Sequence, residues 1–291
     1  MNETEIRPVA QTVDAKPAPL LSVRDLVVRF HQGRQSFVAL NGVSIDVLPG
    51  EVLAVVGESG AGKSTLGRAV LGLVPVQSGT IVFDGADITG ARHRTRLELA
   101  RRLQAVFQDP YSSLNPARTV RAALAEPLLA QRRPRSEIAA AVEASLQRVG
   151  LPADAADRYP RQFSGGQRQR IAIARALMVS PDLVICDEAL SALDLSVQAQ
   201  IINLLLDLRR DLGLAYLFIG HDLAVVRHLA DRVVVLRRGE VVESGRAARV
   251  CAEPSQPYTK ALMESAPVPD PREERARLIA RASAPTGDGD R

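Results

Sequence analysis

Residues 57–65, with the sequence GESGAGKST, carry the residue types that a phosphate-binding loop needs. Gly57, Gly60 and Gly62 allow the backbone to curl, so that its N–H groups converge on phosphate oxygens. Lys63 adds a positive charge near the β and γ phosphates, and the hydroxyl of Ser64 can bind Mg²⁺. The other members of the loop are Glu58, Ser59, Ala61 and Thr65. An apolar strand pattern precedes the loop and a helical pattern follows it, so the segment predicts a nucleoside triphosphate site.

Two carboxylates follow the apolar run 183–186 and are candidates to act on the same nucleotide. Asp187 stands at the end of this run, a position that suits a contact to Mg²⁺ through water. Glu188 could polarise the attacking water, because in-line hydrolysis needs an oriented nucleophile beyond the γ phosphate. The alternative is an acidic pair that only closes a strand at the surface.

Gln108 and His221 are two further candidates for this site. Gln108, within VFQDPYSSLNP, lies where the predicted α/β core meets a helical segment, and its amide could contact the metal or the water. His221 follows the apolar run 215–219, and open α/β sheets bind ligands at that end of their strands. An ordinary loop glutamine and a structural histidine are the alternatives.

Residues 163–167, FSGGQ, form a second glycine motif at the start of a helical pattern. Ser164 and Gln167 have the S-x-x-Q spacing of a capping box, so a well-capped helix start is the simplest interpretation. The N–H groups around Gly165 and Gly166, together with the serine hydroxyl, would also form an anion site. One nucleotide cannot easily occupy both glycine motifs of one chain. Two chains packed head to tail could hold it between them, so that ATP joins a dimer and hydrolysis releases it.

Apolar patterning predicts the elements that position these residues. The runs 52–56, 183–186 and 215–219 are short and continuously apolar, as is typical of parallel strands buried on both faces. Helical patterns separate them, which favours a doubly wound α/β domain. Residues 20–30 and 37–47 have β-rich, partly alternating patterns and are expected to form strands.

The rest of the chain indicates an insertion and two tails. Residues 109–163 are rich in alanine, leucine and arginine and are expected to form helices inserted into the α/β domain. The segment after His221 predicts a hairpin that turns at Arg238 and Gly239. The expected organisation is a disordered tail at 1–19, one domain at 20–266 and a loose extension at 267–291.

Composition excludes several classes of protein. The 291 residues are 46% hydrophobic, and no apolar run approaches the ~20 residues of a membrane span. The first residues lack a signal-peptide pattern, which predicts a cytoplasmic protein. Cys186 and Cys251 are too few for a disulfide framework, a cysteine-only zinc site or an iron–sulfur cluster. The net charge is only +4 and aromatics make up 3%, so a nucleic-acid partner is not expected.

Taken in order, the phosphate loop, Gln108, SGGQ, CDE, SALD (191–194) and His221 resemble the motifs of ATP-binding cassette (ABC) ATPases. Within that superfamily, QDPYSSLNP and PSQPYTKALMESAPVPDP are similar to stretches in the ATPase subunits of oligopeptide and dipeptide permeases, a group that also serves nickel uptake. The resemblance covers about residues 20–271. The stretch ICDE…SALD is more similar to the second of the two paired ATPases of such permeases.

The resemblance implies an α/β P-loop NTPase fold with a parallel core sheet, an N-terminal antiparallel β subdomain and an inserted α-helical subdomain. It implies ATP and Mg²⁺ as cofactors, with Ser64, Gln108 and Asp187 at the metal. Glu188 and His221, with Gln108, would be the catalytic residues.

The resemblance also implies how the chain would assemble. Phe30, or Phe37 as the competing choice, would stack on adenine, and Asp194 would join Ser164 to Gln167 at the dimer interface. The partners would be a second, non-identical ATPase packed head to tail, two membrane-spanning permease subunits that contact the helical insert, and, indirectly, an extracytoplasmic solute-binding protein. The implied function is ATP hydrolysis that energises import of peptides or a related solute, at the cytoplasmic face of the bacterial inner membrane.

Three departures from the family pattern bear on activity. Ala189 replaces the usual proline after Glu188, and Gly220 replaces the usual serine before His221. Neither change removes a group needed for hydrolysis, so an active ATPase is expected. Cys251 stands alone where many relatives carry a cysteine cluster for an iron–sulfur centre.

The alternatives to a peptide-importing ATPase are a regulatory subunit with little turnover, an exporter, and a soluble ABC protein of DNA repair or translation.

Overall fold

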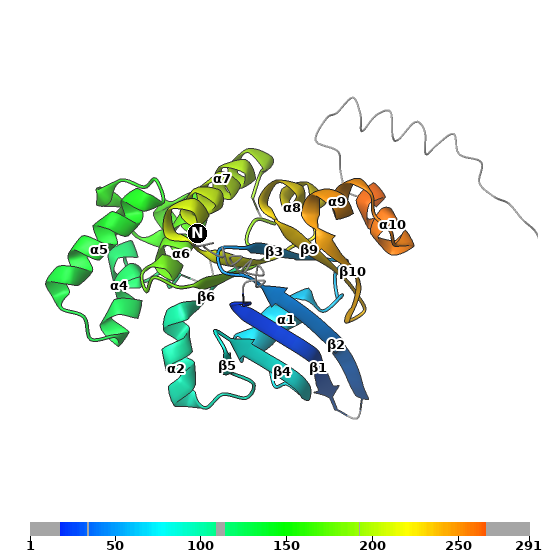
Figure 1. The fold of residues 1–291 in the computed structure, drawn as a ribbon. Helices are drawn as coiled ribbons and strands as arrows, with labels where there is room; N and C mark the ends of the chain where they lie inside the picture. The colour runs from blue at the N-terminus through cyan, green and yellow to red at the C-terminus, as the bar shows by residue number, and fades with distance from the viewer. Residues whose placement is uncertain (1–17, 34, 109–113, 192, 266–291) are drawn as a thin grey trace, which may run out of the picture.

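Two β-sheets organise the chain, and they differ in the direction of their strands (Figure 1). The computed structural model describes residues 18–33, 35–108, 114–191 and 193–265. The predicted α/β fold with a parallel core, an N-terminal antiparallel sheet and inserted helices is confirmed. The expected tail and extension lie outside the described residues except at positions 18 and 19.

The larger sheet has the strand order β10-β9-β3-β8-β7-β6. Its strands are β3 (Val52–Val56), β6 (Leu103–Phe107), β7 (Leu183–Asp187), β8 (Ala215–Ile219), β9 (Arg232–Arg237) and β10 (Glu240–Arg246). All neighbours pair in parallel except β10, which runs antiparallel to β9. The predicted runs 52–56, 183–186 and 215–219 are therefore the central strands.

Burial on both faces explains why these strands are continuously apolar. Every residue of β3, β7 and β8 is buried. Because side chains alternate along a strand, Val52, Ala54 and Val56 pack on one face with α6 (Gly165–Leu177), α7 (Leu195–Leu212) and α8 (Leu223–Leu229). Leu53 and Val55 pack on the other face with α1 (Lys63–Val70) and the smaller sheet.

The smaller sheet is antiparallel, with the order β2-β1-β4-β5. Its strands are β1 (Leu21–Gln32), β2 (Gln35–Val47), β4 (Ser78–Phe83) and β5 (Ala86–Asp87). The two β-rich segments predicted from the sequence are β1 and β2. Strands β4, β5 and β6 and the helix α2 (His93–Arg102) lie outside the predicted set.

The described part of the inserted segment is helical, as expected. It contains α4 (Val120–Ala130), α5 (Arg135–Arg148), η1 (Ala153–Asp157) and η2 (Pro160–Gln162). Arg121 of α4 donates two hydrogen bonds to the carboxylate of Asp157, at 2.9 and 3.1 Å, and so ties the start of the insert to its end. In Figure 1 these green helices lie to one side of the larger sheet.

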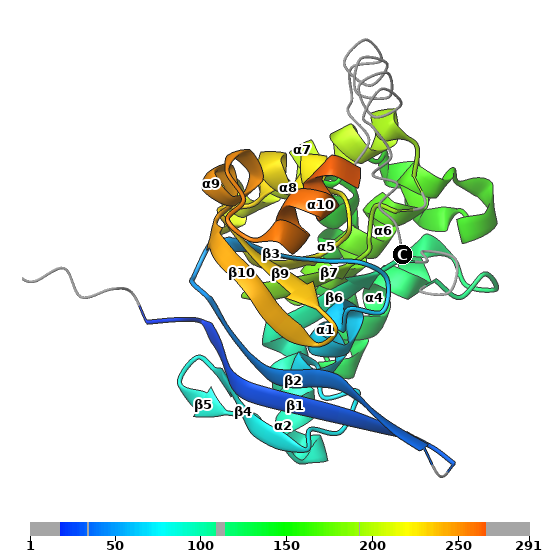
Figure 2. The ribbon, with the colours of Figure 1, turned by 90° about the vertical axis from the view of Figure 1, so that its right-hand side faces the viewer.

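The last described elements return to the sheet that carries the phosphate loop. Strands β9 and β10 form the predicted hairpin, with Arg238 and Gly239 at its turn. The helices α9 (Ala247–Ala252) and α10 (Pro257–Ser265) follow, and Figure 2 shows α10 beside β10 and β9. Within the ranges that the structure covers, no helix is both long enough and apolar enough to cross a bilayer.

Candidate nucleotide site

The order of the central strands brings three functional segments to one edge of the sheet. Strand β3 leads into the phosphate loop, β7 into Asp187 and Glu188, and its neighbour β8 into His221. The backbone N–H of Glu188 donates to the carbonyl of Ile219 at 2.9 Å, and that of Gly220 donates to the carbonyl of Val55 at 3.1 Å. The carboxyl ends of adjacent parallel strands thus form the candidate site.

The phosphate loop needs glycine at positions 57 and 62 for two reasons. Gly57 and Gly62 have φ angles of 152° and 102°, which side-chain-bearing residues rarely adopt. A Cβ atom at Gly57 would lie 2.2 Å from the carbonyl oxygen of Leu236, and one at Gly62 would lie 2.5 Å from that of Ala39. The loop therefore keeps its shape by packing closely against the backbone of β2 and β9.

Lys63 is fixed within the loop. Its side chain is only 4% exposed, and its ammonium donates to the carbonyl oxygens of Gly57 and Glu58, both at 2.8 Å. Burial lowers the pKa of Lys63, and the nearby carboxylates of Glu188 and Asp187 oppose that shift. The protein holds this charge in place with its own carbonyl groups.

Ser64 and Asp187 join the loop to the end of β7. The Ser64 hydroxyl donates to Oδ1 of Asp187 at 2.7 Å. Burial raises the pKa of Asp187, against the opposing effects of this hydrogen bond and of the positive charges of Arg68 and Lys63. A hydroxyl and a carboxylate at this distance suit Mg²⁺, which takes few protein oxygens besides phosphate and water.

Other predicted residues lie around this pair. Gln108 is exposed just after β6 and lines a groove together with Ser64 and Asp187. Among the described residues, no three His, Cys, Asp or Glu side chains gather in a way that could hold a metal ion. A Mg²⁺ ion here would therefore depend on Ser64, Asp187, the Gln108 amide and the phosphates of the nucleotide.

Glu188 has an unusual backbone conformation, with a φ of 49°. This left-handed region is sparsely populated by residues other than glycine, and such residues cluster at functional sites. The carbonyl of Glu188 accepts hydrogen bonds from the N–H and the hydroxyl of Ser191, at 3.1 and 3.0 Å. Glu188 and His221 line one small cavity with Gly220, so the structure brings the two predicted catalytic side chains together.

Residues 164–167, SGGQ, which we call the signature, form the predicted capping box at the start of α6. The Ser164 hydroxyl accepts from the N–H of Gln167 at 3.3 Å, and the Gln167 side chain accepts from the N–H of Ser164 at 3.0 Å. Gly166 packs against Val197 in the first turn of α7, the helix that Asp194 caps. The signature and Asp194 are therefore neighbours, and no hydrogen bond between described residues joins either of them to the phosphate loop.

The two candidate adenine-stacking rings pair across the first hairpin. Phe30 and Phe37 are partners in the register of β1 and β2, with ring centroids 5.4 Å apart. Phe30 is partly buried and packs against the core that the smaller sheet shares with α1, whereas Phe37 is 55% exposed. Which ring contacts adenine stays a prediction.

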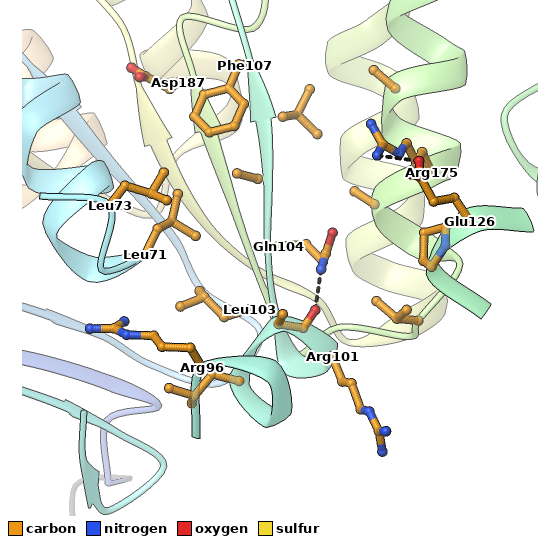
Figure 3. A pocket seen from close by; sticks show the side chains of 18 of the residues that line it. Leu71, Leu73, Arg96, Arg101, Leu103, Gln104, Phe107, Glu126, Arg175 and Asp187 are labelled. Atoms are coloured by element: carbon orange, nitrogen blue, oxygen red, sulfur yellow. Dashed lines mark hydrogen bonds and ion pairs between the residues drawn. The ribbon is translucent and has the colours of Figure 1, made fainter. Parts of the chain in front are cut away.

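A groove of about 1090 Å³ extends from Ser64 and Asp187 toward the inserted helices (Figure 3). The close-up shows Leu71 and Leu73 on one side and Glu126 of α4 and Arg175 of α6 on the other, with β6 running between them. Arg175 and Glu126 form an ion pair of 3.0 Å. The sequence did not indicate this groove, because α2 and β6, which supply much of its lining, have no distinctive local pattern.

Tyr258 contacts the site although its local sequence does not indicate this. Its hydroxyl accepts a hydrogen bond of 3.2 Å from the backbone N–H of Glu58 in the phosphate loop. Tyr258 lies in PYTKAL, which carries the resemblance to permease ATPases, and nothing in its local pattern indicates a contact to the loop.

The sequence matches two family models. The model of the ABC transporter family matches residues 40–191, and that of the oligopeptide/dipeptide transporter C-terminal region matches residues 242–289. The glutathione import ATP-binding protein GsiA of Pectobacterium atrosepticum is 48% identical over 277 residues, which cover 92% of this chain and 44% of that protein. GsiA of Escherichia coli K12 is 46% identical over 280 residues, or 94% of this chain and 45% of that protein. The chain thus spans less than half the length of these relatives.

Solved structures share the fold. CbiO1 from Clostridium perfringens, described as part of the ABC transporter complex cbiONQ, superposes with a TM-score of 0.73 at 31% identity, covering 81% of this chain and 91% of that one. The ATP-binding cassette MJ0796, solved as a dimer in a post-hydrolysis state bound to ADP and Pi, gives a TM-score of 0.71 at 27% identity, covering 78% and 98%.

Proposed function

Because this chain belongs to the ABC transporter ATPase family, we propose that it hydrolyses ATP to energise the import of peptides or a related small solute. The family predicted from the motifs is thereby confirmed. The observation that carries the proposal for the site is the 2.7 Å hydrogen bond from Ser64 to Asp187, which joins the phosphate loop to the acidic strand end beside Glu188.

The proposed mechanism assigns a task to each part of the site. The N–H groups of the loop and the Lys63 ammonium bind the phosphates. Ser64 and Asp187, with Gln108, would hold Mg²⁺, which would neutralise charge on the phosphate oxygens. Glu188 orients the attacking water.

The exposed His221, at the end of the adjacent strand, assists at the γ phosphate. Its place beside Glu188 in one small cavity supports this role. We keep Phe30 as the adenine-stacking ring, with Phe37 as the alternative.

A dimer completes each site in this proposal. The signature residues Ser164 to Gln167 and the neighbouring Asp194 form their own helix caps and, within the described part of the chain, make no hydrogen bond to the phosphate loop of their own chain. We propose that they contact the ATP of a partner packed head to tail. The related cassette MJ0796 was solved as a dimer, which supports a dimeric assembly. We propose a non-identical ATPase as the partner.

The groove supports a second contact, with two membrane-spanning permease subunits. Leu73 and Leu97 line it and are 62% and 59% exposed, and Arg96 and Arg101 also line it. A short helix with apolar and acidic side chains from a membrane subunit would fit this lining. We place the chain at the cytoplasmic face of the bacterial inner membrane, with a solute-binding protein acting indirectly from the other side.

The relatives favour a peptide-like solute. The match of residues 242–289 to a region named for oligopeptide and dipeptide transporters, and relatives named for glutathione import, support this choice. These matches are to transport proteins, so they give no support to a role in DNA repair or translation.

ATP hydrolysis measured with and without membrane subunits tests the proposal. We expect turnover that appears or rises when the chain is co-expressed with its permease subunits. Glu188→Gln should abolish that turnover while ATP binding and a closed dimer remain. The exposed Glu264 gives a matched carboxylate control, because Glu264→Gln should leave turnover unchanged. Full turnover without membrane partners would favour a soluble ATPase. No turnover even with the membrane partners present would favour a regulatory subunit. Normal turnover in Glu188→Gln would refute the role of Glu188 in orienting water.

A further inference from the structure

The phosphate loop is contacted from outside by a helix formed two hundred residues later in the chain. The hydroxyl of Tyr258 on α10 accepts the backbone N–H of Glu58 at 3.2 Å. The carbonyl of the same residue, Glu58, accepts the Lys63 ammonium at 2.8 Å. A single loop residue therefore connects the Tyr258 hydroxyl to the charge that the proposed mechanism places on the phosphates.

Arg237 contacts the Tyr258 ring, and Glu243 anchors the helix that carries it. The guanidinium of Arg237, at the end of β9, lies 4.8 Å from the ring centroid. At the start of α10, the Glu243 carboxylate accepts from the N–H and hydroxyl of Ser255, at 2.9 and 2.6 Å, and from the N–H of Gln256 at 3.1 Å. Tyr258 thus approaches the loop from a helix that is itself anchored to β10.

The same side of the loop is supported by the β9–β10 hairpin. The N–H of Gly239 donates to the carbonyl of Ala61 at 2.9 Å, and the carbonyl of Leu236 lies against Gly57. These contacts fix both ends of the loop's curve. They leave the peptide N–H of Glu58, on the exposed outer side of the loop, to the hydroxyl of Tyr258.

We propose that Tyr258 is a positioning residue for ATP binding. Its hydroxyl holds the Glu58 peptide so that the Glu58 carbonyl, together with that of Gly57, directs the Lys63 ammonium before the nucleotide arrives. Without this hydrogen bond the loop would sample other orientations, and part of the binding free energy would be spent on ordering it. The proposal rests on the proposed ATP site.

A structural role for the ring alone makes a different prediction. If Tyr258 serves only to dock α10, the aromatic ring on Arg237 is the part that matters, and removing the hydroxyl has no effect on the loop. Tyr258→Phe separates the two cases, because it keeps the ring and removes the hydroxyl that reaches Glu58.

The test compares the full-length wild-type chain, Tyr258→Phe and the control Lys260→Ala, an exposed position on the same helix. The first readout is amide hydrogen exchange at Glu58 without nucleotide; the second is KM for ATP against kcat; the third is the thermal midpoint. In Tyr258→Phe we expect faster exchange at Glu58, a KM for ATP raised about two- to tenfold and a smaller change in kcat. A two- to tenfold change corresponds to the loss of about one neutral hydrogen bond. The thermal midpoint and Lys260→Ala should match the wild type.

Unchanged exchange at Glu58 together with an unchanged KM in Tyr258→Phe would overturn the inference. A fall in the thermal midpoint without faster exchange at Glu58 would also overturn it, in favour of a docking role. If the wild type does not bind ATP, the proposed function fails, and the exchange measurement, which needs no nucleotide, still decides whether Tyr258 holds the loop.

Discussion

Replacing Gly166 by alanine should destabilise the protein through a single overlap between α6 and α7. A Cβ atom at Gly166 would lie 2.4 Å from Cγ1 of Val197, well inside van der Waals contact. Val197 cannot move away easily, because its N–H donates to the Asp194 carboxylate at 3.0 Å and its β-branched side chain has one strongly preferred rotamer in a helix. The two helices must shift to accept the methyl group.

Two opposing effects set the size of the change. Inserting a methyl group into a packed interface typically costs about 1–3 kcal/mol of unfolding free energy. Replacing glycine by alanine in a helix raises the unfolding free energy by up to about 1 kcal/mol. With a cost of about 2 kcal/mol, the middle of the first range, and a gain of up to about 1 kcal/mol, the net loss for Gly166→Ala is about 1–2 kcal/mol. In a Val197→Ala background the overlapping atom is gone, so the same change should be neutral or stabilising by up to about 1 kcal/mol.

Chemical unfolding of the wild type, both single variants and the double variant measures this coupling. Gly165→Ala is the matched control, because its nearest atom, Cδ2 of Leu193, would be at an ordinary contact distance of 3.5 Å. Gly165→Ala should keep its stability, and under the proposed dimer it should still reduce turnover. An equal cost of Gly166→Ala in the wild type and in the Val197→Ala background would refute the packing argument.

Two further predictions concern Lys63 in the phosphate loop and Glu243, which anchors α10. Lys63→Ala removes charge-assisted hydrogen bonds to the phosphates, which are worth about 1.5–3 kcal/mol. ATP affinity should therefore fall at least ~10- to 100-fold, and turnover should vanish. Calorimetric titration with ATP measures the affinity, and an unchanged affinity would contradict this prediction. Despite the opposing effect of partial burial, hydrogen bonds from Ser255 and the Gln256 N–H lower the pKa of Glu243 to about 2 from an ordinary 4.5. Because the folded pKa is the lower one, the stabilisation is complete above about pH 4.5 and disappears as the pH falls toward 2. Wild type and Glu243→Gln should therefore differ in thermal midpoint at pH 7 and converge in acid, and parallel profiles would exclude this role.

Short-range spacing predicted the parts of the site whose geometry is local. The capping box of Ser164 and Gln167 needs only three residues of separation, and it forms as expected. The central strands were predictable because burial on both faces requires continuous apolar runs. The hairpin at Arg238 and Gly239 has both a turn signal and two flanking strand patterns.

The missed elements depend on partners that are distant in sequence. Strand β5 has two residues, and among the described strands β6 pairs with β7 alone, at the edge of its sheet, so neither needs a strong pattern of its own. Tyr258 and Glu58 are 200 positions apart, and nothing in either local sequence indicates the other. Predicting such contacts requires the topology, which brings the end of the domain back to its first parallel strand.

The position of β3 between β8 and β9 also has a consequence for synthesis on the ribosome. Strand β3 ends at residue 56, whereas its two neighbours begin at residues 215 and 232. At about 5–20 residues per second, the ribosome needs roughly 10–30 s to make the first of these neighbours. During that time the segment VLAVV has neither hydrogen-bonding edge satisfied, which makes it a target for chaperones and for misassociation. The strand that carries the phosphate loop is translated early but can complete its pairing only after most of the domain has left the ribosome.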